Sequence, residues 1–354
     1  MVSPDASKSS YTSIPHLETS WLQQVILSTK INFARFIAGT WVAYLQYKTK
    51  PPRPGEVRSF PSHPYLKNRI FQPPNKTSDG PPPLFLDIHG GGFILFNPSI
   101  DDAFNTQLAK DLNCLVISLD YSKAPRAKFP IATNELIDTI LDILADDSLI
   151  FDRSRVVLGG HSAGGNLTIS CAQSPHLRGK LAGVLPWFPA TDFSDDHTVK
   201  AKLRPYNVVG EVDPLLHQII GIRYAYVKPG QDLRDPRLST VFADRATLPK
   251  YIMIVGAEND MLAHEAWRQA RRLAGLDDGV DWEDDQVAKY GFEDEKKGVR
   301  FLLVRGAKHG YTHFMGGNGV QEERRRRQAK ESELEVKAWL ERGPFAKASK
   351  RNSQ

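Results

Sequence analysis

The chain has 354 residues, of which 41% are hydrophobic and 25% are charged, and it contains 26 glycines and 24 prolines. This composition excludes a collagen-like, a coiled-coil or a wholly disordered chain, and it indicates a globular protein built on one large α/β domain, alone or with an elaboration. The formal net charge is +5, and no basic stripe with interleaved aromatic residues accompanies it, so we expect no nucleic-acid partner.

The N-terminal segment predicts a helix. Residues 1–20 lack the basic start and apolar run of a secretory signal, so we expect a cytoplasmic protein. Between Ile31 and Leu45 apolar residues recur at helical spacing. The longest uncharged run, Phe36–Tyr47, is too short to span a bilayer, so we expect no transmembrane segment. A helix that covers a core or pocket is the favoured interpretation, and a helix on a membrane surface is the alternative.

Short apolar runs alternate with helical patterns along the rest of the chain. Two edge strands are expected at 57–60 and 69–72, and buried strands are expected at 84–88, 114–119, 155–158, 181–185, 251–255 and 301–304. Helices are expected near 101–112, 131–146, 163–173, 262–275 and 320–341. This alternation predicts an α/β fold with a mostly parallel central sheet and helices on both of its faces.

Two stretches interrupt the alternation. Residues 189–247 are too many for a bare loop, so we predict an inserted cap over the carboxyl edge of the sheet, between core segments 51–188 and 248–342. Residues 277–299 begin with a strongly acidic run and predict a solvated surface loop. Residues 343–354 form a basic tail.

Metal-ligand patterns are missing from the sequence. Cys114 and Cys171 stand in apolar stretches, without the spacing of a disulfide framework or a metal site, so we expect two buried small hydrophobic side chains. The acidic run also lacks the spacing and turn glycine of a calcium loop. We therefore expect no metal.

The most specific motif is Gly160-His161-Ser162-Ala163-Gly164, between a predicted strand and a predicted helix. A nucleophile on such a tight turn needs glycines two residues away on either side, because the backbone is crowded there. The turn raises the Ser162 hydroxyl above the strand end and leaves the Ala163 amide free at the helix N-terminus. The sequence therefore predicts a nucleophilic serine.

A second motif, His89-Gly90-Gly91-Gly92, follows the strand at 84–88. Consecutive glycines expose backbone N–H groups that can stabilise an oxyanion. A plain turn or a phosphate-binding loop is the alternative. No Gly-Lys-Ser/Thr follows, and the spacing does not fit the G-x-G-x-x-G dinucleotide motif, so we expect no cofactor. We interpret His89 as a structural hydrogen-bonding residue.

The general base and its orienting acid are expected after the last two strands. His309 stands on a glycine-bounded loop just after the run at 301–304, with His313 as the local alternative. Asp260 follows the run at 251–255, with Glu258 as the alternative on the same loop. The order Ser162, Asp260, His309 is typical of the α/β-hydrolase fold.

Together these motifs resemble the hormone-sensitive-lipase-like carboxylesterases, an α/β-hydrolase family that includes arylacetamide-deacetylase-like enzymes. The resemblance runs from Pro83 to Leu340 and includes the three glycines after His89, Asp120-Tyr121, the turn at Ser162 and Asp235-Pro236-Arg237-Leu238-Ser239. It implies that Gly91, Gly92 and Ala163 supply the oxyanion amides. It also implies that the N-terminal helices within 1–50 join the insert as a cap over the acyl site.

Three positions depart from the family pattern. His161 stands where the family commonly has an acid, Ser122-Lys123 replaces a basic-apolar pair, and Arg126 stands where an acid usually follows the proline. These departures leave the triad intact and bear on substrate preference.

The sequence thus predicts a serine-dependent carboxylic-ester hydrolase that acts on small apolar or aromatic esters through an acyl-enzyme. Phe93, Trp187, Phe188 and the apolar residues of 31–47 are the expected pocket walls. Lactone or amide hydrolysis, a cyclisation with the same triad, and a non-catalytic small-molecule receptor are the alternatives. The partner expected is a small-molecule ester, and a homodimer is left open.

Overall fold

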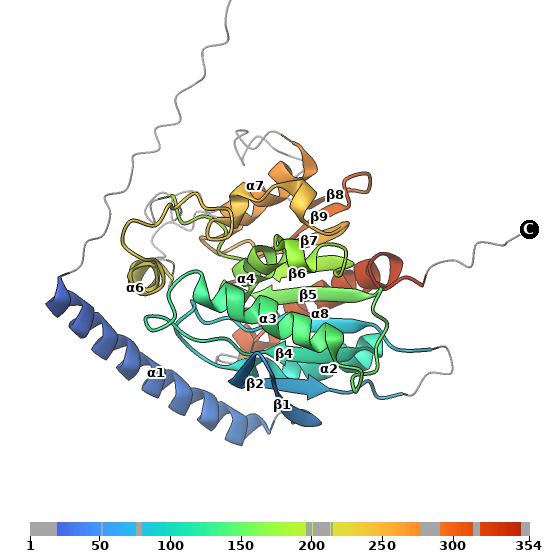
Figure 1. The fold of residues 1–354 in the computed structure, drawn as a ribbon, viewed down its shortest axis with the longest axis horizontal. Coiled ribbons are helices and arrows are strands. Elements are labelled where there is room, and N and C mark those ends of the chain that lie inside the picture. The colour runs from blue at the N-terminus through green and yellow to red at the C-terminus, as the bar shows by residue number, and fades with distance from the viewer. Residues whose placement is uncertain are drawn as a thin grey trace, which may run out of the picture.

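The computed structural model of the protein describes residues 20–50, 52–75, 80–195, 200, 213, 215–276, 291–313 and 319–347. A nine-stranded sheet runs through its centre in the order β1-β2-β4-β3-β5-β6-β7-β9-β8 (Figure 1). The strands are β1 (Glu56–Phe60), β2 (His63–Phe71), β3 (Leu84–Ile88), β4 (Leu115–Leu119), β5 (Val156–His161), β6 (Gly183–Trp187), β7 (Tyr251–Ala257), β8 (Gly291–Asp294) and β9 (Val299–Val304).

Parallel pairing joins the six central strands β4, β3, β5, β6, β7 and β9. Antiparallel pairing adds the outer strands. Strand β2 pairs with β4 and with β1 at one side, and β8 pairs with β9 at the other. The carboxyl ends of the parallel strands therefore meet at one edge, where a site can be assembled from several loops. The predicted α/β fold with a mostly parallel sheet is confirmed.

Helices cover both faces of the sheet. They are α1 (Trp21–Thr49), α2 (Asp102–Leu112), α3 (Ile131–Ala145), α4 (Ala163–Ala172), α6 (Leu216–Tyr226), α7 (Ala263–Ala274) and α8 (Gly319–Arg342). Side chains alternate across a strand, so Leu84, Leu86 and Ile88 of β3 enter one core with α3, α4 and α7, whereas Phe85 enters a second core with α2 and α8. Two hydrophobic cores thus hold the sheet between helical layers.

Most predicted elements lie within a few residues of their expected positions. The six buried strands and the five core helices are all present. Cys114 and Cys171 are buried free thiols, as expected. The second expected edge strand, β2, is an internal strand, because it is paired along both sides.

The surface loop expected over 277–299 is wrong in its C-terminal part. Residues 291–294 form the edge strand β8, and β9 already begins at Val299. Phe292 of β8 packs on Phe301 of β9, with ring centroids 6.3 Å apart, so an apolar contact accompanies the backbone pairing. The sequence pattern did not indicate this short strand, because acidic residues directly follow its apolar residue.

Helix α1 covers the core and a cavity with only part of its apolar surface. Ile31 and Leu45 are buried, but Phe33 and Phe36 are 66% and 69% exposed. Helix α1 runs along the outside of the molecule and contacts α6 (Figure 1). Its apolar residues are too widely distributed around the helix for all of them to face the core. No helix in the described part of the chain combines the length and apolar character needed to cross a bilayer.

Part of the predicted insert is described. Helix α6 and short 3-10 turns at Thr240–Phe242 and Arg245–Thr247 belong to it. The role of the insert and of α1 as a cap stays a prediction. Other expected segments lie outside the described residues, namely 1–19, most of 196–214, the acidic run 277–290 and the end of the basic tail, 348–354.

Candidate active site

The three predicted catalytic side chains follow three parallel strands at the carboxyl edge of the sheet. Ser162 stands between β5 and α4, Asp260 follows β7, and His309 follows β9. In the sheet β6 lies between β5 and β7, and β9 lies next to β7, so these loops meet although Ser162 and His309 are 147 residues apart in the chain.

The backbone at Ser162 has the strained geometry that the motif predicts. Its φ is 56° and its ψ is −113°, a conformation that costs a non-glycine residue free energy. A Cβ at Gly160 would lie 2.6 Å from the Ile88 carbonyl oxygen, and one at Gly164 would lie 1.9 Å from the same atom. Both glycines are therefore required by the close approach of β3, and the tight turn points Ser162 into a pocket.

Hydrogen bonds link the three side chains in one line. His309 Nε2 lies 2.9 Å from Ser162 Oγ, and His309 Nδ1 lies 2.7 Å from Asp260 Oδ2. The other oxygen of Asp260 accepts a bond from the Leu262 amide, so the carboxylate is held on both sides. Burial lowers the pKa of His309, but the charge and hydrogen bond of Asp260, together with the charges of Asp213 and Glu265, outweigh it and raise the pKa above the ordinary 6.5.

The alternative candidates have other partners. Glu258 accepts a hydrogen bond from the Gly306 amide at 2.6 Å and so holds the loop before His309. His313 bonds to Asp101, and its Nε2 lies 2.5 Å from the carboxylate oxygen. His89 is buried, stacks on Tyr121 at 4.5 Å and bonds the Gly90 carbonyl oxygen through Nδ1, which agrees with a structural role.

The predicted oxyanion amides lie around the serine. Gly91 and Gly92 line the same pocket as Ser162, and both have positive φ, 114° and 60°. Ala163 is the first residue of α4, and amides in the first turn of a helix lack an acceptor within the helix. Across the described residues, no backbone acceptor is bonded to the Gly91 or Gly92 amide. These N–H groups are therefore available to a ligand beside the serine.

A pocket of about 630 Å³ opens over this line of residues. Phe188 lines it, and its ring lies edge-on to His309 with centroids 4.9 Å apart. Phe93 and Trp187, which the sequence placed in the wall, are instead 1% exposed and do not line it. Phe93 is stacked on Tyr226 at 3.8 Å, and Trp187 is stacked on the His161 ring at 4.9 Å. Both are core residues behind the pocket.

The apolar wall comes from segments that the sequence analysis did not single out. No described side chain of α1 lines the pocket, which corrects the expectation for residues 31–47. The wall residues are Ile94, Leu95, Phe96 and Ile100, from the segment after the glycines, and Leu215 and Ile222, at α6. The sequence does contain an apolar run here, Phe93-Ile94-Leu95-Phe96, which could have indicated this wall. It did not show that Phe93 turns inward while its neighbours face the cavity.

A polar cluster of two buried residues and one partly buried residue lines the same pocket as the serine. Asp101, His161 and His313 place their ligand atoms within 4.8 Å of one another, so they are the described residues that could hold a metal ion. Burial, together with the neighbouring imidazoles, lowers the pKa of His161 well below 6.5, and burial lowers that of His313 to about 4. Both imidazoles are therefore neutral, the form that binds metals, near pH 7. The expectation of no metal stays a prediction.

Comparison with known proteins agrees with this architecture. Residues 85–293 match the family model described as the α/β hydrolase fold. The chain belongs to the α/β-hydrolase fold family. An arylesterase of Saccharolobus solfataricus is 31% identical over 219 residues, which are 61% of this chain and 68% of that protein. An AB hydrolase superfamily protein of Schizosaccharomyces pombe is 29% identical over 226 residues, 61% and 65% of the respective chains.

Solved structures show the same fold for this α/β hydrolase. The Pyrobaculum calidifontis esterase aligns with a TM-score of 0.69 and 24% identity, over 93% of this chain and 100% of that one. An ester hydrolase from the metagenome of Lake Arreo, in complex with a derivative of bipyridine phosphonate, aligns with a TM-score of 0.63 and 25% identity, over 82% and 84% of the two chains.

The departures of this α/β hydrolase from the expected motif fall in two places. His161 is 1% exposed and packs between Trp187 and Phe104, within 3.7 Å of Asp87. Lys123 and Arg126 line a separate cavity beside the pocket. Neither place disturbs the line from Ser162 to Asp260.

Proposed function

We propose that the protein is a serine-dependent carboxylic-ester hydrolase acting on small apolar or aromatic esters. The observation that carries the proposal is the pair of hydrogen bonds that connects Ser162, His309 and Asp260 beneath an apolar pocket. The similarity to an arylesterase and to ester hydrolases of known structure supports the same class of reaction.

In the first half of the reaction, His309 Nε2 takes the proton of Ser162 as the hydroxyl oxygen attacks the ester carbonyl. The Asp260 carboxylate holds the opposite side of the imidazole and stabilises its positive charge. Amides of Gly91, Gly92 and Ala163 stabilise the oxyanion, and removing one such donor typically costs about 3–4 kcal/mol of transition-state stabilisation. His309 then gives the proton to the leaving alcohol, and an acyl-enzyme remains on Ser162.

In the second half, a water molecule replaces the alcohol. His309 removes a proton from that water as its oxygen attacks the acyl carbonyl, and returns the proton to Ser162 when the acid leaves. The net result is one ester and one water converted to an acid and an alcohol. The pocket favours apolar substrates, because apolar side chains such as Ile94, Phe96 and Ile222 line it together with the serine.

A series of p-nitrophenyl esters of increasing acyl length tests the proposal. We expect turnover in the native chain, and a fall in kcat/KM on the order of 10⁴-fold or more in Ser162→Ala and His309→Ala. Equal turnover in the native chain and in folded Ser162→Ala would contradict the mechanism.

Product analysis in ¹⁸O-labelled water separates hydrolysis from cyclisation. A hydrolase incorporates one labelled oxygen into the acid product, because water attacks the acyl-enzyme. A product without the label would favour the alternative of cyclisation, in which an internal nucleophile resolves the same intermediate.

A further inference from the structure

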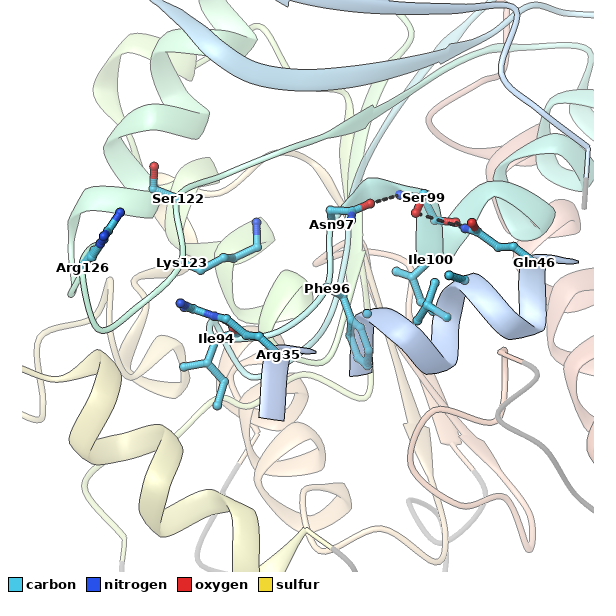
Figure 2. A pocket seen from close by; sticks show the side chains of 13 residues that line it. Arg35, Gln46, Ile94, Phe96, Asn97, Ser99, Ile100, Ser122, Lys123 and Arg126 are labelled. Carbon is cyan, nitrogen blue, oxygen red and sulfur yellow. Dashed lines mark hydrogen bonds between the residues drawn. The ribbon is translucent and has the colours of Figure 1, made fainter. Parts of the chain in front are cut away.

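A second cavity lies between α1 and the core, separate from the catalytic pocket (Figure 2). Its volume is about 610 Å³, within the range of small-molecule binding sites. Ile94, Phe96 and Ile100 line both cavities, so the two are divided by a single segment of chain. This cavity has no role in the proposed hydrolysis.

The cavity is strongly basic for its size. Arg35 of α1, Lys123 and Arg126 line it, and no described Asp or Glu does (Figure 2). These three side chains come from two segments, so the fold rather than local sequence brings them together.

Arg35 is held in place by neutral acceptors. Its guanidinium donates to the Ile94 carbonyl oxygen at 2.7 Å and to the Ala124 carbonyl oxygen. Among the described residues it forms no ion pair. Burial lowers its pKa, and the positive charge of Arg126 lowers it further. The fold thus keeps two like charges close together in a cavity that no described carboxylate lines.

Of the three basic side chains in the cavity, Lys123 is the one paired with a carboxylate. Its ammonium lies 2.9 Å from Asp120 Oδ1 and 3.8 Å from the centre of the Tyr121 ring. Glu135, which is also near Lys123, accepts a hydrogen bond from the Ser122 amide. Asp120 and Glu135 therefore offset the positive charge of Lys123, although neither carboxylate lines the cavity.

Arg126 supplies guanidinium N–H groups that a ligand in the cavity can use. It is exposed, lines the cavity, and has no ion pair within the described part of the chain. It also stands where the family that the sequence resembles commonly has an acid, so the charge at this position is reversed. A guanidinium fork matches the two oxygens of a carboxylate.

The rest of the wall is partly polar and partly apolar. Gln46, Asn97 and Ser99 line it and are hydrogen-bonded to one another, and Ser122 stands beside Lys123 (Figure 2). Val42 and Ala43 of α1 line the cavity together with Ile94, Phe96 and Ile100. We propose that this cavity binds an amphipathic carboxylate, whose apolar body lies between α1 and the 94–100 segment and whose carboxylate pairs with Arg126 beside Arg35.

Calorimetric titration with sodium octanoate, and with octanamide as its neutral counterpart, tests the proposal in the full-length chain. We expect octanoate to bind about tenfold more tightly than octanamide, the difference typical of one charge-assisted hydrogen bond. Arg126→Glu should weaken octanoate binding by about tenfold or more and leave octanamide unchanged. Arg178→Glu is the matched control, because Arg178 is also exposed and lines neither cavity.

Salt gives a second measurement that needs no substitution. Octanoate affinity should fall as ionic strength rises, and octanamide affinity should not. Equal affinities for the two probes, or an Arg126→Glu effect no larger than that of Arg178→Glu, would overturn the proposal. Arg126 lines this cavity and not the catalytic pocket, so the effect of Arg126→Glu does not depend on whether the chain is a hydrolase.

Discussion

At the scale of single residues, the hydrogen-bonded arrangement of Ser162, Asp260 and His309 was predictable, because chain order and the glycines around the serine fix its members. Gly160 and Gly164 indicate the turn at Ser162. Asp260 and His309 each follow a strand that a run of apolar residues predicts. Phe93 and Trp187 were placed wrongly because the direction in which a side chain leaves a loop depends on tertiary packing. Phe93 has a φ of 63° and turns toward Tyr226, which no local pattern indicates.

Gly164→Ala tests the close approach at the serine turn. The new Cβ would lie 1.9 Å from the Ile88 carbonyl oxygen, so β3 and α4 must separate. We expect a loss of about 3 kcal/mol or more in the free energy of unfolding, measured by urea denaturation. Gly39→Ala is the control, since a Cβ there meets nothing within 4 Å and a helical alanine is favourable. Equal stabilities of the two variants would show that β3 and α4 are not in this close contact.

Asp260→Asn tests how the imidazole is tuned. His309 must be neutral to accept the serine proton, so kcat/KM should rise with pH through a pKa above 6.5 in the native chain. Removing the carboxylate removes the charge that raises this pKa, so the acid limb should move to lower pH. We also expect a fall in kcat on the order of 10⁴-fold. A pH–rate profile measures both effects, and an unshifted acid limb would contradict the role of Asp260.

At the scale of elements, the buried strands were predictable because a parallel strand reads as a continuous apolar run. Strand β8 was missed because only one of its residues, Phe292, is a large apolar side chain. Helix α1 was predicted as a helix but not in its placement, since a stripe of apolar residues does not specify what the helix covers. Its contribution to a basic cavity through Arg35 depends on contacts with Ile94 and Ala124, which are distant in sequence.

The wall that α6 contributes gives a prediction about substrate size. Ile222 lines the pocket and approaches Gly92, where an added Cβ would lie 2.6 Å from its Cδ1 atom. Ile222→Ala should enlarge the pocket beside the oxyanion loop and shift the preferred p-nitrophenyl ester toward longer acyl chains. Ile150→Ala, at a residue 67% exposed, is the control. An unchanged length preference would place the acyl chain elsewhere in the pocket.

At the scale of the whole molecule, two separate cores hold the sheet, and each contains one cysteine. Cys171 belongs to the core with α3, α4 and α7, and Cys114 to the core with α2 and α8. Burial raises the pKa of both thiols far above its ordinary value, so neither forms a reactive thiolate.

Thiol titration therefore reports on both cores at once. We expect no reaction with a disulfide reagent in the native chain and two reactive thiols in denaturant. Rapid reaction of one thiol in the native chain would show that its core opens.

Covalent labelling with a p-nitrophenyl alkylphosphonate tests the central claim most directly, because the reagent reacts only with an activated nucleophile. Intact-mass and peptide analysis should find one adduct per chain, on Ser162, with labelling abolished in Ser162→Ala and strongly slowed in His309→Ala. A folded native chain that stays unlabelled, or that carries the adduct on another residue, would contradict the account.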